Sequence, residues 1–189
     1  MPFKDLIKRC RSYRRFYEDC KIEENLLREL VDLARLSASA ANLQPLKYML
    51  SCQPTRNDLI FPALFWAGHI KDWPGPKEGE RPSAYIIILG DKTIAKTFEY
   101  DCGIAAHSIL LGAVEKGLGG CMLGAIDKDL LRKNLNIPQQ YDILLVIALG
   151  KPKEKVVIEE SEGDIKYYRN KNNTHHVPKR SLDEIILKI

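Results

Sequence analysis

The stretch AYIIILGD, residues 84–91, is a continuous apolar run that follows Pro82 and closes near Gly90. A second run of the same kind, DILLVIALG, occupies residues 142–150. Strands that are apolar at every position, without alternation, are typical of strands buried on both faces of a sheet. The two runs therefore predict two central strands.

Helices are predicted around these strands. At residues 2–10 and 23–37 the apolar residues recur at helical spacing. The segment 97–116 is rich in glycine and alanine, which would let another helix approach closely. Asp127 is expected to cap the short helix that follows it. The expected helices span residues 2–10, 23–37, 58–67, 97–116 and 127–135.

The remaining segments are predicted to be strands, loops or a tail. KYMLSC, residues 47–52, and a short piece of GLGGCMLGAID, residues 117–127, are expected strands. The stretch 68–82 contains three prolines and three glycines and is expected to be a long surface loop, of the kind that often covers a binding site. Residues 151–180 are polar and precede an apolar end, LDEIILKI. We expect this end to dock either on its own domain or on a partner subunit.

The composition restricts the class of protein. A chain of 189 residues suits a single domain, and 45% hydrophobic with 29% charged residues is ordinary for a soluble globular protein. The net charge of +4 is too small to make nucleic acid or an anionic membrane the expected partner. No apolar run is long enough to span a bilayer, and the N-terminus lacks the apolar core of a signal peptide. The five cysteines are scattered without a CxxC pair, which favours a reducing cytoplasm over a disulfide framework or a zinc knuckle.

Several familiar catalytic motifs are absent or incomplete. GLGGCMLG has Met122 where a dinucleotide fingerprint needs its third small residue, and GAVEKGLG has Leu118 where a P-loop needs lysine. There is no GxSxG motif, and the four histidines show no zinc spacing, so no metal site is expected. His107 is interpreted as a hydrogen-bonded core or interface residue, and Cys102 and Cys121 as packing residues.

Four separated segments share a different chemical character, because they are short, irregular and rich in amides, glycines or cations. Arginine forks bind phosphate oxygens bidentately. The amides of Asn42 and Gln44 suit the edge of a pyrimidine ring, and Gly124 with Ala125 let the backbone come close to a flat ring. RSYRRF alone is more often a solvated basic turn, but together the segments predict a site for a phosphorylated flat heterocycle. The segments are RSYRRF (11–16), SASAANLQP (37–45), GCMLGAI (120–126) and HHVPKRS (175–181).

The order and spacing of six segments resemble the nitroreductase-like family of FMN-dependent oxidoreductases. The resemblance implies an α+β fold with a central mixed β-sheet surrounded by helices. It also implies one domain over residues 1–189 in an intertwined homodimer with both FMN sites at the subunit interface, where residues 151–189 form a C-terminal arm that reaches the partner subunit. The six segments are residues 11–16, 37–48, 66–85, 101–127, 148–152 and 175–182.

The same resemblance assigns FMN contacts to particular residues. Arg11 and Ser12 fall where the family binds the phosphate, and Arg14 falls where the pyrimidine side of the ring is within reach. Lys179 and Arg180 match the family's C-terminal basic pair, which binds the same phosphate. The full set of expected contacts is Arg11, Ser12, Tyr13, Arg14, Ser39, Ala40, Asn42, Gln44, Gly124, Ala125, Lys179 and Arg180.

Two of these segments are expected to surround the ring itself. The loop that contains Ser39 and Asn42 corresponds to residues lining the isoalloxazine and the ribityl chain, and residues 124–125 match the backbone beside flavin N5. The sequence departs from the family pattern at Cys10, where many members have arginine, and at Ala38, where proline is frequent. The first departure puts one phosphate contact in doubt, and the second implies a less rigid loop.

The activity that the resemblance implies needs no catalytic side chain, because FMN carries the chemistry. NADH or NADPH would pass hydride to FMN, and a small electron-poor acceptor such as a nitroaromatic or a quinone would then be reduced in a ping-pong cycle. A cation near flavin N1, expected to be Arg14, would stabilise the reduced anionic ring. Two alternatives stay open: a dehalogenase-like or flavin-fragmenting relative, with residues 68–82 as part of the substrate wall, and a non-enzymatic anion-binding module.

Overall fold

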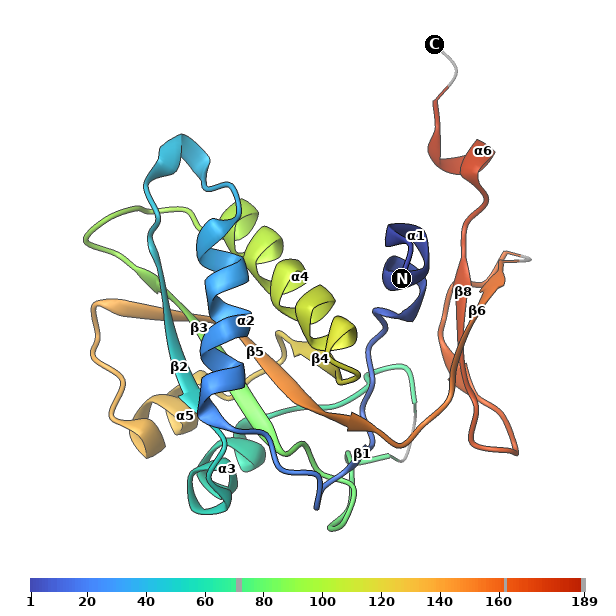
Figure 1. The fold of residues 1–189 in the computed structure, drawn as a ribbon, viewed down its shortest axis with the longest axis horizontal. Coiled ribbons are helices and arrows are strands. Elements are labelled where there is room, and N and C mark those ends of the chain that lie inside the picture. Colours follow the sequence, from blue (N-terminus) through green and yellow to red (C-terminus); the bar gives the residue numbers. More distant parts are fainter. Residues whose placement is uncertain (71–72, 162, 188–189) are drawn as a thin grey trace.

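The computed structural model describes residues 1–70, 73–161 and 163–187, in which helices cover a central sheet and a smaller sheet lies to one side (Figure 1). The helices are α1 (Phe3–Arg9), α2 (Glu24–Leu36), α3 (Pro54–Ile60), α4 (Glu99–Glu115), α5 (Lys128–Leu135) and α6 (Leu182–Ile185), with 3-10 turns η1 (Ala40–Asn42) and η2 (Phe61–Ala63). The strands are β1 (Phe16–Tyr17), β2 (Leu46–Ser51), β3 (Ala84–Asp91), β4 (Gly119–Leu123), β5 (Tyr141–Pro152), β6 (Val156–Glu160), β7 (Tyr168–Arg169) and β8 (His175–Lys179). No helix among these residues is long and apolar enough to cross a membrane.

The central sheet is built on the two strands that the apolar runs predict. Its five strands follow the order β1-β5-β3-β2, with β4 paired to β5. Each of these pairings is antiparallel. The sequence analysis expected a mixed sheet, and the parallel part described for this sheet is a single bridge between Ser12 and Gly120.

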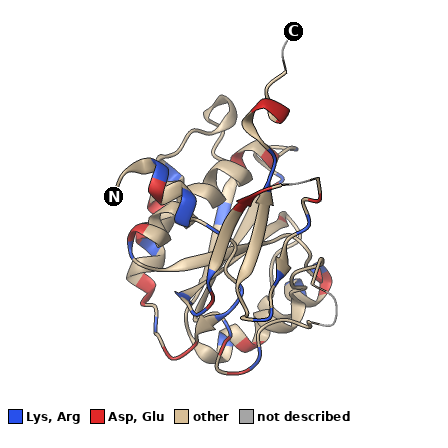
Figure 2. Cartoon of the chain, turned by 90° about the vertical axis from the view of Figure 1, so that its right-hand side faces the viewer, with Lys and Arg blue, Asp and Glu red and all other residues tan. Residues whose placement is uncertain are grey.

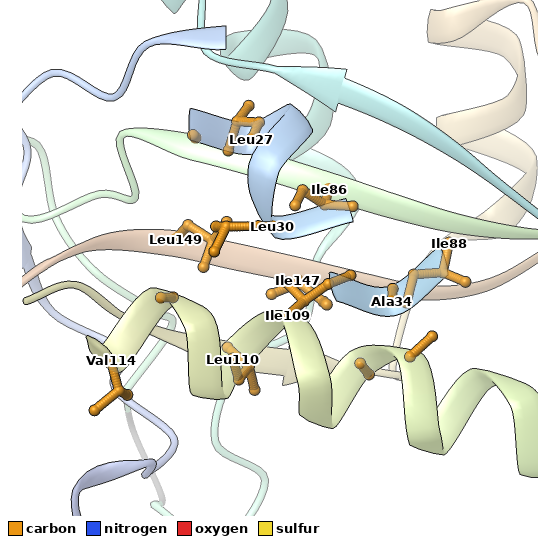
Figure 3. Packing of buried hydrophobic residues seen from close by; sticks show 14 of the residues in the cluster. Leu27, Leu30, Ala34, Ile86, Ile88, Ile109, Leu110, Val114, Ile147 and Leu149 are labelled. Atoms are coloured by element: carbon orange, nitrogen blue, oxygen red, sulfur yellow. The ribbon is translucent and has the colours of Figure 1, made fainter. Parts of the chain in front are cut away.

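Both faces of β3 and β5 are covered, which confirms the prediction for the two apolar runs. All eight residues of β3 are buried. Ile86 and Ile88 face α2 and α4, where they pack with Leu30 (Figure 3). Tyr85 and Ile87 point to the opposite face and join a second cluster with residues from α3, η2 and α5. Each buried Leu or Ile contributes about 1.5–3 kcal/mol relative to exposure, so the two-sided burial of these strands holds the domain together.

Small residues in α4 allow close packing, as the sequence predicts. A Cβ atom at Gly112 would lie 2.3 Å from Leu33 Cδ1 and 3.0 Å from Leu30 Cδ2, so a larger residue here would displace these leucine side chains of α2. By contrast, a Cβ atom at Gly103 would have no neighbour within 4 Å. The first half of α4 therefore presents an open face, while its second half is packed inside the chain.

Two expectations about secondary structure need correction. The helix expected at 58–67 begins and ends earlier, as α3 followed by η2, because Pro54 suits a first helical turn and Pro62 lacks the N–H that a longer helix requires. The polar tail is more ordered than expected, since β6, β8 and β7 form a three-stranded sheet. Asp127 caps α5 as predicted, with its Oδ1 accepting from Leu130 N at 2.9 Å.

Candidate functional site

The two cationic ends of the chain meet at a cavity of about 250 Å³. In Figure 1, α1 and the sheet of β6, β8 and β7 lie on the same side of the molecule, next to α4. Figure 2 looks onto that side and shows Lys and Arg on α1 and where β8 leads into α6. The convergence of Arg11 with Lys179, the geometric premise of the predicted phosphate site, is therefore present. The lining residues are Cys10, Arg11, Ser12, Arg14, His107, Leu110, Met122, Tyr167, His175, Val177 and Lys179.

Arg14 is buried at the inner end of this cavity and is held in place from several directions. Its Nη1 donates to the carbonyl of Ser12 at 3.2 Å and lies 3.2 Å from His175 Nε2. Its guanidinium carbon lies 4.8 Å from the centre of the Tyr167 ring. The backbone N–H of Arg14 donates to the carboxylate of Glu154, which lies 140 residues further along the chain.

Three buried side-chain nitrogens of residues that line the cavity lack hydrogen-bond partners among the described residues. They are Arg11 Nε and Arg14 Nε, which are N–H donors, and His175 Nδ1. The Arg11 side chain is otherwise fixed by its Nη2, which donates to Ile7 O at 3.0 Å. A buried donor without an acceptor costs about 1–3 kcal/mol, and such groups are rare in native proteins. Several of them around one cavity indicate a ligand rich in acceptor oxygens.

The charges around the cavity favour an anion. Arg11, Arg14 and Lys179 line it, whereas the nearby carboxylate of Glu154 is fully buried and paired with Arg169 Nη2 at 3.1 Å. His175 adds no positive charge at neutral pH, because burial and then the neighbouring Arg14 lower its pKa to about 4. The residues therefore fit a phosphate group, which carries up to two negative charges and accepts several hydrogen bonds.

Arg15 does not take part in this site, although it belongs to the same basic cluster. Its Nε and Nη2 donate to the two carboxylate oxygens of Glu80 at 2.8 and 2.6 Å, and Lys153 Nζ lies 3.3 Å from the same carboxylate. Arg180 pairs with Glu184 and is not among the residues that line the cavity. Arg15 and Arg180 are thus paired with carboxylates, whereas Arg11 and Lys179 line the cavity.

We expect the Arg15–Glu80 pair to stabilise the fold in a pH-dependent way. Hydrogen bonds from Arg15 are the main reason that the pKa of Glu80 is lowered from 4.5 to about 2. Because the folded-state pKa is depressed, this stabilisation is complete above pH 5 and is lost as the pH falls from about 5 to 2. Lowering the pKa from 4.5 to about 2 corresponds to about 3 kcal/mol, at about 1.4 kcal/mol per pKa unit.

Urea unfolding of the wild type and Glu80→Gln at pH 6 and pH 3 measures this effect. The wild type should be more stable at pH 6, and its advantage over Glu80→Gln should shrink by about half at pH 3, where Glu80 is protonated in the unfolded chain but still mostly ionised in the folded one. Other carboxylates titrate in both proteins and cancel in the comparison. A difference in unfolding free energy that is equal at the two pH values would contradict the assignment.

The loop at 37–45 is strained and held by defined hydrogen bonds. Ala41, Asn42 and Gln44 adopt positive φ angles of 49°, 54° and 51°. The N–H of Ala40 donates to Asp101 Oδ1 at 3.2 Å, and Ser39 Oγ accepts from Gln44 N at 2.9 Å. Non-glycine residues in this region cost about 1–3 kcal/mol each and cluster at functional sites, so the conformation supports a binding role for this loop.

Within one chain, however, this loop lies away from the cationic cavity. Ser39 and Gln44 line a different cavity of about 160 Å³, together with Asp101 and residues of α2. Figure 1 shows η1 beyond the C-terminal end of α2, across α4 from α1 and β8. The structure therefore does not bring Ser39, Ala40, Asn42 and Gln44 together with Arg11 and Lys179 in a single protomer.

Gly124 and Ala125 follow β4, which leads away from the cavity past Met122. Both residues are exposed. The carbonyl of Ala125 accepts from Phe65 N at 3.1 Å. A Cβ atom at Gly124 would meet only Leu145 Cδ1, at 3.9 Å, so space remains beside the backbone for a ring.

Tyr13 is turned away from the cavity, unlike its neighbours Arg11 and Ser12. Its hydroxyl donates to Arg9 O at 3.0 Å, and its ring lies where a side chain on Gly119 would sit. It therefore packs the segment rather than facing the cavity.

Several residues of the cavity were not identified from the sequence. His175 lies in the segment HHVPKRS without a predicted role, and Tyr167 lies in the polar tail. Glu154 also lies in this tail and binds the backbone of Arg14 without lining the cavity. His107 is exposed and lines the cavity, so its interpretation as a core residue is wrong, while an interface role remains open. In the sequence, these residues are marked only by the presence of histidine and aromatic residues near a basic motif. That signal is too weak to assign them to a site without knowledge of the fold.

Comparisons with known proteins identify the family and the fold of this chain. The Nitroreductase family model matches residues 7–151. The NADH dehydrogenase of Thermus thermophilus is 25% identical over 173 residues, which cover 77% of this chain and 84% of the relative.

Two solved structures share the fold. A nitroreductase family protein from Clostridium difficile 630 has a TM-score of 0.71 at 21% identity and covers 99% of this chain and 98% of its own. An FMN-dependent nitroreductase from Clostridium difficile R20291 has a TM-score of 0.64 at 22% identity and covers 79% of this chain and 87% of its own.

Proposed function

Because the chain belongs to the nitroreductase family, we propose that it is an FMN-dependent oxidoreductase. It passes hydride from NADH or NADPH through FMN to a small electron-poor acceptor, such as a nitroaromatic or a quinone, in a ping-pong cycle. The observation that carries this proposal is the cavity at which Arg11 and Lys179 meet, where the buried Nε–H groups of Arg11 and Arg14 find no acceptor in the described part of the chain. The FMN supplies the hydride chemistry when bound, so that the residues of the chain bind and orient it.

The residues around the cavity have distinct proposed roles. Arg11, Ser12 and Lys179 bind the phosphate, for which the guanidinium fork and the ammonium group provide charge-assisted hydrogen bonds. Arg14 lies deeper and directs its guanidinium toward the pyrimidine side of the ring, where a positive charge favours the reduced anionic form. The exposed backbone at 124–125 lies beside the ring, where no side chain of the same chain fills the space.

We further propose that the complete site needs two copies of the chain. The cavity of about 250 Å³ is below the range of about 300–1,000 Å³ that is usual for a whole ligand, and the loop with Ser39, Ala40, Asn42 and Gln44 lies elsewhere in the protomer. This loop in the partner subunit would cover the ring. The C-terminal arm, residues 151–189, would reach that partner, since Ile185, Ile186 and Leu187 are 62%, 53% and 82% exposed. Apolar side chains that are exposed together generally mark an interaction surface.

Visible spectroscopy and light scattering test the proposal. Purified protein incubated with FMN and then desalted should be yellow, should lose its flavin absorbance when NADH or NADPH is added without oxygen, and should regain it when a quinone is added. Its mass should be twice 21.5 kDa. A protein that stays colourless with excess FMN would exclude the function, and a monomer that retains FMN would exclude the shared site.

A further inference from the structure

His175 and His176 are adjacent on β8 and point to opposite sides of the small sheet. His176 Nδ1 lies 2.8 Å from Glu159 Oε2, its Nε2 lies 3.0 Å from Asn170 Nδ2, and its ring stacks on Tyr168. His175 is 1% exposed and lies among the residues that line the cationic cavity. Alternation along a strand thus gives two neighbouring histidines different surroundings.

The contact between His175 and Arg14 fixes which ring nitrogen carries the proton. Arg14 Nη1 lies 3.2 Å from His175 Nε2, and a guanidinium group can only donate hydrogen bonds. Nε2 must therefore accept, so the ring is neutral and its proton lies on Nδ1. The surroundings keep it neutral, because burial and then the positive charges of Arg14 and Arg169 lower the pKa of His175.

Arg14 depends on this acceptor for its orientation. The other side-chain contacts of Arg14 are the carbonyl of Ser12 and the face of the Tyr167 ring. The Tyr167 ring centre also lies 5.2 Å from that of His175, so both aromatic side chains limit where the guanidinium can move. Without an acceptor at position 175, one further donor of a buried guanidinium would be left unpaired.

We infer that His175 is a positioning residue, which accepts a hydrogen bond from Arg14 and so holds the guanidinium toward the flavin ring. The inference rests on the proposed function, because it assigns Arg14 to the ring. In this role His175 acts on the ring through Arg14.

Three substitutions test the role of His175. His175→Gln keeps a carbonyl oxygen that can accept from Arg14, whereas His175→Phe fills the same space without an acceptor. We expect His175→Phe to lower FMN affinity about tenfold, as loss of a hydrogen bond to a charged group does, and His175→Gln to stay within about threefold of the wild type. His176→Phe is the matched control and should leave FMN affinity within about twofold. Equal affinities for His175→Phe and the wild type would overturn the inference, provided that the wild type binds FMN.

A double-mutant cycle of His175→Phe with Arg14→Gln separates the positioning of Arg14 by His175 from a general effect on folding. His175→Phe should shift the midpoint potential of bound FMN in the negative direction in the wild-type background and should not shift it in the Arg14→Gln background. Equal shifts in both backgrounds would show that His175 acts independently of Arg14. Circular dichroism of each variant confirms that it is folded.

One measurement needs no flavin. It therefore tests the contact between His175 and Arg14 separately from the proposed function. Nitrogen-15 NMR of the ring in the flavin-free protein should show His175 as the neutral tautomer with its proton on Nδ1 at pH 6, and His175→Gln should lack this signal. A charged ring, or a proton on Nε2, would contradict the contact with Arg14 even in a protein that binds FMN well.

Discussion

Replacing Arg11 and Lys179 together by methionine should lower the affinity for FMN by about 100-fold or more and leave the affinity for riboflavin almost unchanged. Both side chains line the cavity, and the two come from segments near opposite ends of the chain. A hydrogen bond between charged groups contributes about 1.5–3 kcal/mol, so that loss of two of them corresponds to at least a factor of about 100. Riboflavin lacks the phosphate, and its binding should therefore not depend on these cations.

Titration of flavin fluorescence with each ligand measures the effect. The matched control is the double variant Arg28→Met with Lys92→Met, which removes the same charge from exposed ion pairs with Glu24 and Asp142. This control should bind FMN like the wild type, because its charges are far from the cavity. If FMN and riboflavin lose affinity equally in the Arg11 and Lys179 variant, the two residues do not bind the phosphate.

Glu154→Ala should lower the free energy of unfolding by about 3–5 kcal/mol, the usual result of breaking a buried ion pair by removing one partner. The side chain of Glu154 is 0% exposed and that of Arg169 is 12% exposed. The same carboxylate accepts the backbone N–H of Arg14. The substitution would therefore leave a guanidinium and a backbone donor without their acceptor, and FMN affinity should fall as Arg14 loses its support.

Chemical denaturation monitored by circular dichroism measures this loss. Glu159→Ala is the control, since Glu159 belongs to the same tail and its carboxylate is 32% exposed, so its removal should cost about 0–1 kcal/mol. Combining Glu154→Ala with Arg169→Met should recover part of the loss, because the unpaired buried charge is removed. A loss below about 1 kcal/mol for Glu154→Ala would show that this pair does not hold the tail to the segment around Arg14.

Much of the fold could be predicted from the sequence because its signals are local. The apolar runs at 84–91 and 142–150 fall within β3 and β5, and α2 follows the periodicity of its apolar residues. The small sheet of the tail could not be predicted in this way. Its strands are short, and β8 pairs with β6 in parallel and with β7 in antiparallel orientation across the intervening loops.

The sequence by itself determined the central strands and the main helices, and it pointed to the two cationic segments that meet at the cavity, because strand and helix periods and short motifs depend on neighbouring residues. Only the tertiary structure decided which cations can bind an anion and which are already paired within the chain. Arg15 is paired with Glu80, 65 residues away, and Arg14 is fixed by Glu154 and His175, 140 and 161 residues away. Ion pairs and hydrogen bonds over such separations leave no periodic trace in a single sequence, since they depend on where the folded chain places the partners.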